Sequence, residues 1–188
     1  VYGHLPPGFS RWEITDRSGQ TVAHAAATKG TLPRDFDRWN LTGRYGTTVA
    51  HVAAICGCLP EDFKHWGLVD NEGWTVAHVA AWHGHLPPSF DLWNLAINYD
   101  GAPVSLEDDE MKIAMTVAYN GKSVAHIAAV SGHLPRDFDQ WDIVDRNGWP
   151  GAHAAAIYGK LPPDFDRWDL TDANGYTVAH AATLSGKP

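Results

Sequence analysis

Cysteine is scarce in this sequence, because only Cys56 and Cys58 occur among its 188 residues. Two cysteines separated by a single residue cannot form a disulfide framework, which is consistent with a reducing compartment. Long apolar runs are also absent: no stretch approaches the roughly 18 residues that a membrane-spanning helix needs, and no signal-like segment begins the chain. We therefore expect a cytoplasmic protein that has no membrane partner.

Positive charge is in the minority, with 14 Lys and Arg against 22 Asp and Glu and a formal net charge of −8. Nucleic acids and anionic membranes attract cationic surfaces, so this balance argues against direct nucleic-acid binding and is compatible with a partner that has a basic surface. Catalytic signatures are missing as well, because no Gly-rich phosphate loop, nucleophile elbow or metalloprotease helix is present. We therefore predict a protein that is not an enzyme and needs no cofactor.

Short motifs that recur with one period dominate the sequence. A histidine in "VAH" or "GAH" stands at His24, His51, His78, His126, His153 and His180. The tryptophan of "FxxW" stands at Trp12, Trp39, Trp66, Trp93, Trp141 and Trp168, and "LP" follows the same series. Each series advances by 27 residues except for one step of 48, so one unit carries a 21-residue insertion. Three independent markers with one period identify an internal repeat.

We treat the chain as a single repeat domain, 1–188. Its parts are a partial unit 1–18, the units 19–45, 46–72, 73–120, 121–147 and 148–174, and a partial unit 175–188, with the insertion at about 96–120. Because both ends of the sequence fall within a unit, we expect a fragment or a processed chain.

The unit reads G-x-T-V-A-H-x-A-A-x-x-G-x-L-P-x-D-F-x-x-W-x-L-x-D-x-x and predicts two short helices. The Thr can cap a first helix, the Ala-rich run favours helix, and the Gly after it suits a helix C-terminus. The Pro suits the first turn of a second helix, on which Phe and Trp would share one face. Since such a unit cannot bury its own apolar face, stacked units predict an elongated all-α solenoid with a Phe–Trp core ladder.

The first half of each unit resembles the ankyrin repeat. "GTTVAHVAAICG" (46–57) and "GWTVAHVAAWHGH" (73–85) are similar to the ankyrin signature G-x-T-P-L-H-x-A-A-x-x-G-H, with Val-Ala in place of Pro-Leu. The period is 27 residues where ankyrin repeats have about 33, so the missing residues must come from the second helix and the finger-like turn. The resemblance implies an ankyrin-like solenoid that binds another protein along a concave face formed by the turns and first helices.

The repeated histidines have two readings. Catalysis would require an activated partner such as Ser or Asp at a fixed position, and the sequence shows no such constellation. The ankyrin resemblance implies instead that each histidine forms hydrogen bonds locally and to the adjacent turn. We therefore expect a structural role for all of them.

Partner binding is expected at the positions that vary between units, namely the residue after the first Gly and the two residues after "AA". These positions are rich in aromatic residues that the core pattern does not require, as is typical of interface anchors. The alternative is that they only fill space between shortened units. The candidate partner-binding residues are Trp74, Trp82, His83, Lys122, Trp149, Tyr158 and Tyr176.

Two further candidates lie near these positions. Cys56 and Cys58 occupy the same repeat positions as His83 and His85 one unit later, so stacking could bring together a tetrahedral zinc set, which we regard as a weak alternative to no metal site. The insertion contains four adjacent acids, Glu107, Asp108, Asp109 and Glu110, followed by a segment of strand-like composition. It is either a hairpin that contributes to partner binding or a tolerated surface loop.

The leading hypothesis from the sequence is a non-enzymatic protein-interaction module that binds its partner through a concave aromatic face. The alternative is an acidic inhibitor or effector, of phage or bacterial origin, that blocks a basic or nucleic-acid-binding protein and would be delivered into a host cell if it acts as an effector. Strong sensitivity of binding to salt would favour this alternative.

Overall fold

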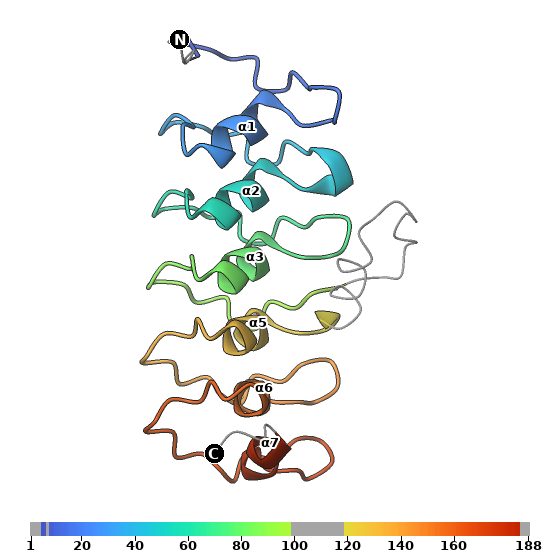
Figure 1. Ribbon diagram of the computed structural model, residues 1–188, viewed down its shortest axis with the longest axis vertical. Coiled ribbons are helices and arrows are strands. Elements are labelled where there is room, and N and C mark those ends of the chain that lie inside the picture. Colours follow the sequence, from blue (N-terminus) through green and yellow to red (C-terminus); the bar gives the residue numbers. More distant parts are fainter. Residues whose placement is uncertain (1–4, 7, 99–118, 185–188) are drawn as a thin grey trace.

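The computed structural model of the chain describes residues 5–6, 8–98 and 119–184. These residues form one elongated stack, in which successive units follow one another from the N-terminal to the C-terminal end (Figure 1). The predicted all-α repeat solenoid is confirmed, because the described residues contain α-helices and isolated bridges but no extended strand. The helices are α1 (Val22–Thr28), α2 (Val49–Cys56), α3 (Val76–His83), α5 (Val124–Ser131), α6 (Gly151–Ile157) and α7 (Val178–Leu184).

Helix caps explain where each helix begins and ends. In α2 the side chain of Thr48 accepts a hydrogen bond from the His51 backbone N–H at 3.4 Å, and Thr75 caps α3 in the same way at 3.3 Å. At the other end, Gly57 and Gly84 adopt the left-handed conformation, with φ of 66° and 74°. Glycine adopts this conformation without strain, so the predicted caps are confirmed at these helices.

The second helix of each unit is absent from the described residues, so the prediction of two helices per unit is wrong. The segment from Leu-Pro to the residue after Trp, which we call the ladder loop, forms two separate turns instead. In one ladder loop the Phe36 N–H donates to the Pro33 carbonyl and the Leu41 N–H to the Arg38 carbonyl, both at 3.1 Å. A short segment does not continue such turns into a helix, because helix nucleation fixes several dihedral angles for a single hydrogen bond.

The Phe and Trp side chains of the ladder loops form the predicted core ladder. Phe36 and Trp39 meet edge to face with ring centroids 5.0 Å apart, and Trp39 meets Phe63 of the next unit at 5.4 Å. This alternation continues from Phe9 to Trp168. Edge-to-face packing is a favourable geometry for aromatic rings, so the ladder stabilises every unit boundary.

A tight turn joins each ladder loop to the next helix, on the side of the stack opposite the ladder loops (Figure 1). In one turn Asp70 Oδ1 accepts the N–H groups of Glu72 and Trp74 at 3.0 and 2.9 Å. The same pair of bonds forms at Asp16, Asp145 and Asp172.

The insertion lies within one of these turns. Ile97 takes the position of the turn aspartate, and an isolated bridge joins Ala96 to Ser123 as Val69 joins Thr75 one unit earlier. The insertion therefore lengthens one turn and leaves the stacking of the helices intact. The hairpin that we considered for it falls in 99–118, outside the described residues.

The helices are short. The longest of them, α2, α3 and α5, have eight residues each. In the part of the chain that the structure describes, no helix has the length and apolar character needed to cross a membrane.

Candidate partner-binding face

Three of the repeated histidines, His24, His51 and His126, connect their own helix cap to the turn of the next unit. His51 Nδ1 lies 2.7 Å from Thr48 Oγ1 and 3.2 Å from the Thr48 backbone N–H. Since an N–H can only donate, Nδ1 is the acceptor and Nε2 carries the proton, which it donates to the Trp74 carbonyl at 3.0 Å. His24, His126 and His153 form the equivalent bond to the next turn.

Burial lowers the pKa of three of these histidines. It lowers the pKa of His24 and His126, although the bond to a turn carbonyl partly opposes the effect. His78 is fully buried, and this burial lowers its pKa to about 3. At His24, His51 and His126 both imidazole nitrogens are engaged by the fold, which agrees with the structural role that the sequence predicts for these histidines.

Two histidines of this series have an incomplete set of hydrogen bonds. The buried Nε2 of His78 completes no hydrogen bond, although the Lys122 and Leu95 carbonyls lie near enough to offset part of the effect of burial on its pKa. The buried Nδ1 of His153 has no partner because Pro150 replaces the capping Thr and offers neither a hydroxyl nor an N–H. The incomplete bonding of His78 lies beside the insertion. That of His153 lies in unit 148–174, the unit that departs most from the repeat pattern.

Trp74, Trp82 and Tyr119 pack together beside α3, and with Tyr158 they form what we call the aromatic cluster. The ring centroid of Trp82 lies 6.3 Å from that of Trp74 and 5.6 Å from that of Tyr119, and Trp74 lies 5.9 Å from Tyr119. Burial, together with the nearby Tyr158 hydroxyl, raises the pKa of Tyr119. Trp74 and Trp82 come from unit 73–120, Tyr119 from the end of the insertion in that unit, and Tyr158 from unit 148–174.

Exposure differs sharply within the aromatic cluster. Trp74, one of the candidate partner-binding residues, is only 9% exposed, because Trp82 and Tyr119 pack against it. Trp82 is half-buried and Tyr158 is 48% exposed. A partner can therefore contact Trp82 and Tyr158, whereas Trp74 supports them from beneath.

Lys122, Asp145 and Trp149 form a second group on the turn side. The Lys122 ammonium pairs with Asp145 Oδ2 and lies 5.8 Å from the centroid of the Trp149 ring. Burial by itself would raise the pKa of Asp145, but the Lys122 ammonium and the Trp149 and Asn147 amides lower it overall. Lys122 is therefore engaged within the protein, and half-buried Trp149 is held beside it.

The remaining candidates lie apart from these groups. Tyr176 is 58% exposed. Its ring meets the His180 ring edge to face, with the two centroids 5.5 Å apart. His83 is exposed and stacks on His85 with ring centroids 6.2 Å apart. Burial, followed by the charges of His85 and His133, lowers the pKa of His83.

The alternative zinc set finds no support in the geometry. Among the described residues, which include Cys56, Cys58, His83 and His85, no three side chains of metal-ligating type come together. His85 Nδ1 instead lies 2.8 Å from the Ala54 carbonyl of the preceding helix, and Cys58 Sγ donates to the Cys56 carbonyl at 3.4 Å.

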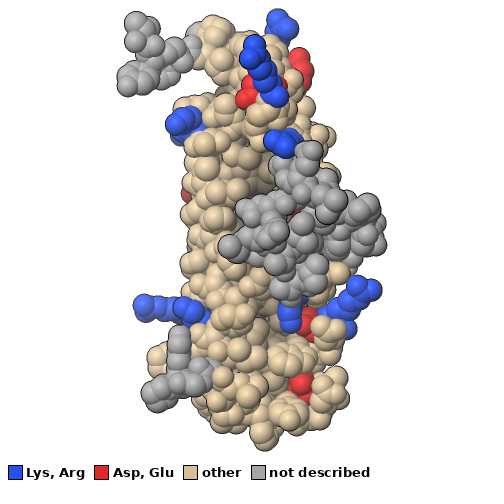
Figure 2. All heavy atoms as spheres, turned by 45° about the vertical axis from the view of Figure 1, so that its right-hand side comes forward, with Lys and Arg blue, Asp and Glu red and all other residues tan. Residues whose placement is uncertain are grey.

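Charge is distributed unevenly between the two sides of the stack. Outside the ladder loops, the described residues contain six cations, Arg17, Lys29, Arg44, Lys122, Arg146 and Lys160, and five acids, Asp16, Asp70, Glu72, Asp145 and Asp172. On the described surface that Figure 2 brings forward, Lys and Arg together with Asp and Glu are seen in the upper and lower parts. The six ladder loops contain 12 Asp and Glu but only six Lys and Arg. The insertion acids Glu107, Asp108, Asp109 and Glu110 lie outside the described residues.

Sequence reasoning missed Tyr119 as a functional candidate. Its signal was available, since it is an aromatic residue two positions before Gly121, where the repeat resumes. It also missed that Asp145 would engage Lys122, because the turn motif identified the aspartate only as a turn residue.

No family model and no curated protein matches the chain. Among solved structures, the crystal structure of the ankyrin repeat domain of Bcl-3, described as a unique member of the IkappaB protein family, is similar over 94% of this chain and 86% of that chain. The TM-score is 0.56 and the sequence identity is 15%. The fold is ankyrin-like. This ankyrin-like stack differs from a repeat of about 33 residues in that turns replace the second helix of its 27-residue unit.

Proposed function

We propose that this ankyrin-like chain is a non-enzymatic protein-interaction module whose partner binds the turn side of the stack around the aromatic cluster. The observation that carries the proposal is the exposure of aromatic rings that the core does not need. Trp82 and Tyr158 are not part of the Phe–Trp ladder that packs the unit boundaries. Their rings are nevertheless held in fixed positions by Trp74 and Tyr119. Rigid aromatic anchors on a surface whose charges largely balance are typical of interface hot spots.

The surrounding groups support this choice of face. Lys122 forms an ion pair with Asp145, and one carboxylate oxygen of each turn aspartate accepts hydrogen bonds from backbone N–H groups. Little free charge therefore opposes burial of this surface by an apolar partner. Trp149 and Tyr176 extend the same side of the stack into the two following turns. The partner is accordingly expected to present apolar and hydrogen-bonding groups to the cluster.

The test is affinity capture with the purified chain, followed by mass spectrometry and a direct binding measurement on the captured protein. Trp82→Ala combined with Tyr158→Ala should weaken that binding at least about tenfold, since half-buried Trp82 and exposed Tyr158 are the two rings of the cluster that a partner can contact. Trp168→Ala is the matched control, because this ring is 44% exposed but lies on the ladder loops. Binding that survives the double variant, or is lost equally with the control, would refute the proposed face.

A second candidate function follows from the acid excess of the ladder loops, which suits a basic partner. In that case binding would weaken steeply with salt, because exposed charges are screened within about 10 Å at 0.1 M ionic strength. Asp137→Asn combined with Asp139→Asn would weaken it, whereas the Trp82 and Tyr158 variant would not. Binding that is insensitive to salt eliminates this candidate.

A further inference from the structure

Basic side chains line one edge of the stack, where the helices end. We call this the helix-end edge, and it consists of the Gly that closes each helix with the residue on either side of it, 29–31, 56–58, 83–85, 131–133 and 158–160. Its basic residues are Lys29, His83, His85, His133 and Lys160. It contains no Asp or Glu, although the chain has a net charge of −8. The acid excess of the ladder loops is therefore separated from a basic edge.

The histidines of the helix-end edge form a continuous file from unit to unit. The His85 ring lies over Gly57 of the preceding unit, because a Cβ added to that glycine would stand 3.1 Å from the ring. The His133 ring lies over Gly84 in the same way, at 2.9 Å. Burial, followed by the charges of His85 and His133, lowers the pKa of His83, so the three imidazoles influence one another as one group.

Hydrogen bonds and packing hold this file in place. His85 Nδ1 donates to the Ala54 carbonyl at 2.8 Å, and His133 Nδ1 donates to the Ala81 carbonyl at 3.2 Å. The Lys160 side chain continues the file over the helix-closing glycine of the preceding unit, 3.2 Å from where a Cβ would stand. Because each imidazole uses Nδ1 as a donor, it can take up a second proton without losing its bond to the fold.

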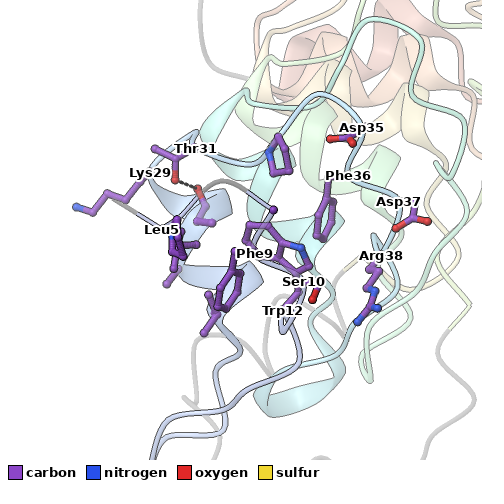
Figure 3. A pocket seen from close by; sticks show the side chains of 16 residues that line it. Leu5, Phe9, Ser10, Trp12, Lys29, Thr31, Asp35, Phe36, Asp37 and Arg38 are labelled. Carbon is purple, nitrogen blue, oxygen red and sulfur yellow. Dashed lines mark hydrogen bonds between the residues drawn. The ribbon is translucent and has the colours of Figure 1, made fainter. Parts of the chain in front are cut away.

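The positive charge of this edge is not neutralised by acids of the described residues. No ion pair formed among these residues includes a side chain of the helix-end edge. Figure 3 shows the Lys29 side chain extending away from the other labelled side chains, with Asp35 and Asp37 of the ladder loop on the opposite side of the view. The edge therefore differs from the turn side, where Asp145 pairs with Lys122.

A row of apolar side chains runs directly beside the edge. The residue before the edge is Ile55, Trp82, Val130 and Ile157 in four successive units. Ile55 is 44% exposed, and the other three are half-buried. The helices that carry them, α2, α3, α5 and α6, stack in this order, so the row is continuous and passes through the aromatic cluster at Trp82 (Figure 1). An apolar row and a basic edge thus lie side by side along four units.

We propose that the partner bound at the aromatic cluster is an acidic amphipathic segment, whose apolar side chains contact the row from Ile55 to Ile157 and whose carboxylates meet the helix-end edge. The inference rests on the proposed function, because it names the chemistry of the partner bound at that face. Charge complementarity selects this occupant, since carboxylates find cations there that no acid of the described residues has paired. A basic segment would be repelled, and a nucleic acid would need a denser array of cations than two lysines and three histidines.

The test begins with a displayed library of random peptides of about 16 residues, which reach about 24 Å as a helix. The library is selected on the wild-type chain and counter-selected on the variant that combines Trp82→Ala with Tyr158→Ala, so that every retained peptide requires the aromatic cluster. The retained peptides should have a net negative charge and should combine Asp or Glu with apolar residues. One of them is then synthesised, and its Kd is measured by fluorescence anisotropy.

Charge reversal at the edge tests where the carboxylates bind. Lys160→Glu should weaken binding of this peptide about fivefold or more, because an attraction becomes a repulsion at an exposed position. Lys64→Glu is the matched control, since it makes the same change of charge at an exposed residue of a ladder loop. It should leave the Kd within about twofold of the wild type, because distant exposed charges are screened.

Acidification tests the histidines of the edge. Exposed imidazoles gain positive charge between about pH 7.5 and about pH 5.5, while the carboxylates of the peptide stay ionised, so binding should strengthen about threefold or more. His85→Gln combined with His133→Gln should lose most of this pH dependence. The Gln amide can still donate to the carbonyl that each imidazole bonds, and circular dichroism should show an unchanged fold.

The outcomes separate this inference from the proposed function. Retained peptides that are neutral or basic, or that Lys160→Glu and Lys64→Glu weaken equally, would overturn the acidic partner and leave the aromatic face in place. An oligonucleotide that binds the wild-type chain more tightly than the peptide, and that Lys160→Glu releases, would overturn it in favour of a nucleic acid. A library that retains no peptide dependent on Trp82 and Tyr158 would overturn both the proposed face and this inference.

Discussion

Replacing Pro150 with threonine should stabilise the protein, because it restores a helix cap that the other units have. In three of them the Thr hydroxyl lies 2.7 Å from a buried or half-buried His Nδ1 and accepts from the His backbone N–H at 3.3 to 3.4 Å. At His153 this Nδ1 is buried without a partner. The backbone at Pro150, with φ −65° and ψ 150°, is close to that of Thr75 at −89° and 161°, so threonine fits without rearrangement.

The expected gain combines three effects. A Thr cap contributes about 0.5–2 kcal/mol, and satisfying a buried polar atom contributes about 1–3 kcal/mol, in part through the same bond. Losing the conformational restriction that proline imposes on the unfolded chain costs about 0.4–1 kcal/mol. The free energy of unfolding should therefore rise by about 1–2 kcal/mol, which for a domain of this size raises Tm by about 3–6 °C.

Guanidinium and thermal unfolding, followed by circular dichroism, measure this gain. Pro150→Val is the matched control, because it restores the backbone N–H and has the shape of threonine without the hydroxyl. It should gain clearly less than Pro150→Thr. A threonine variant no more stable than the wild type would show that the His153 defect is not what limits this unit, and a valine variant equally stabilised would show that the hydroxyl is not the source of the gain.

Three further predictions concern the core and the charges. His78 has its pKa lowered from 6.5 to about 3 on folding, so the unfolded state binds the proton first. The free energy of unfolding should therefore be highest above pH 6.5 and should fall by about 1.4 kcal/mol per pH unit as the pH drops toward 3. Urea unfolding midpoints that do not change between pH 7 and pH 4 would contradict the burial argument. Lys122→Met and Asp145→Asn should show a coupling energy of about 0.5–3 kcal/mol in a double-mutant cycle of denaturant unfolding, and strict additivity would mean that the pair is not coupled. Trp93→Leu should cost roughly 2–4 kcal/mol, whereas Trp168→Leu, at a ring that is 44% exposed, should cost less than half as much; equal losses would argue against the ladder.

The helix half of each unit could be predicted from sequence because several local signals agree there. In α2, Thr48 caps the N-terminus, the Ala-rich run favours continuation of the helix, and Gly57 ends it. Each of these signals acts over a few residues. The ladder loop could not be assigned in the same way. Residues three apart, such as Phe36 and Trp39, lie on one side of both a helical turn and a pair of consecutive β-turns, so the pattern fits both.

The candidate site was predicted less well than the fold, because repeat position gives the direction of a side chain and not its neighbours. Trp74 and Trp149 occupy the same repeat position, but Trp74 is 9% exposed beneath Tyr119 while Trp149 stands beside Lys122. Tyr119 belongs to a segment outside the period, so no repeat argument could place it over Trp74.

The constant spacing of the contacts between units has a consequence for how such a chain can change length in evolution. The histidine-to-carbonyl bonds made by His24, His51, His126 and His153 all span 23 residues. Duplication or deletion of one whole unit leaves every such bond with a valid partner, whereas a change of any other length within a helix or ladder loop displaces all the contacts at that boundary. The turn can accept an insertion of another length, as the 21-residue insertion shows. Even there, the Nε2 of His78 lacks the hydrogen bond to the next turn that the other buried histidines form. Gene-level variation in this protein is therefore expected to proceed by whole units, with new sequence entering at the turns.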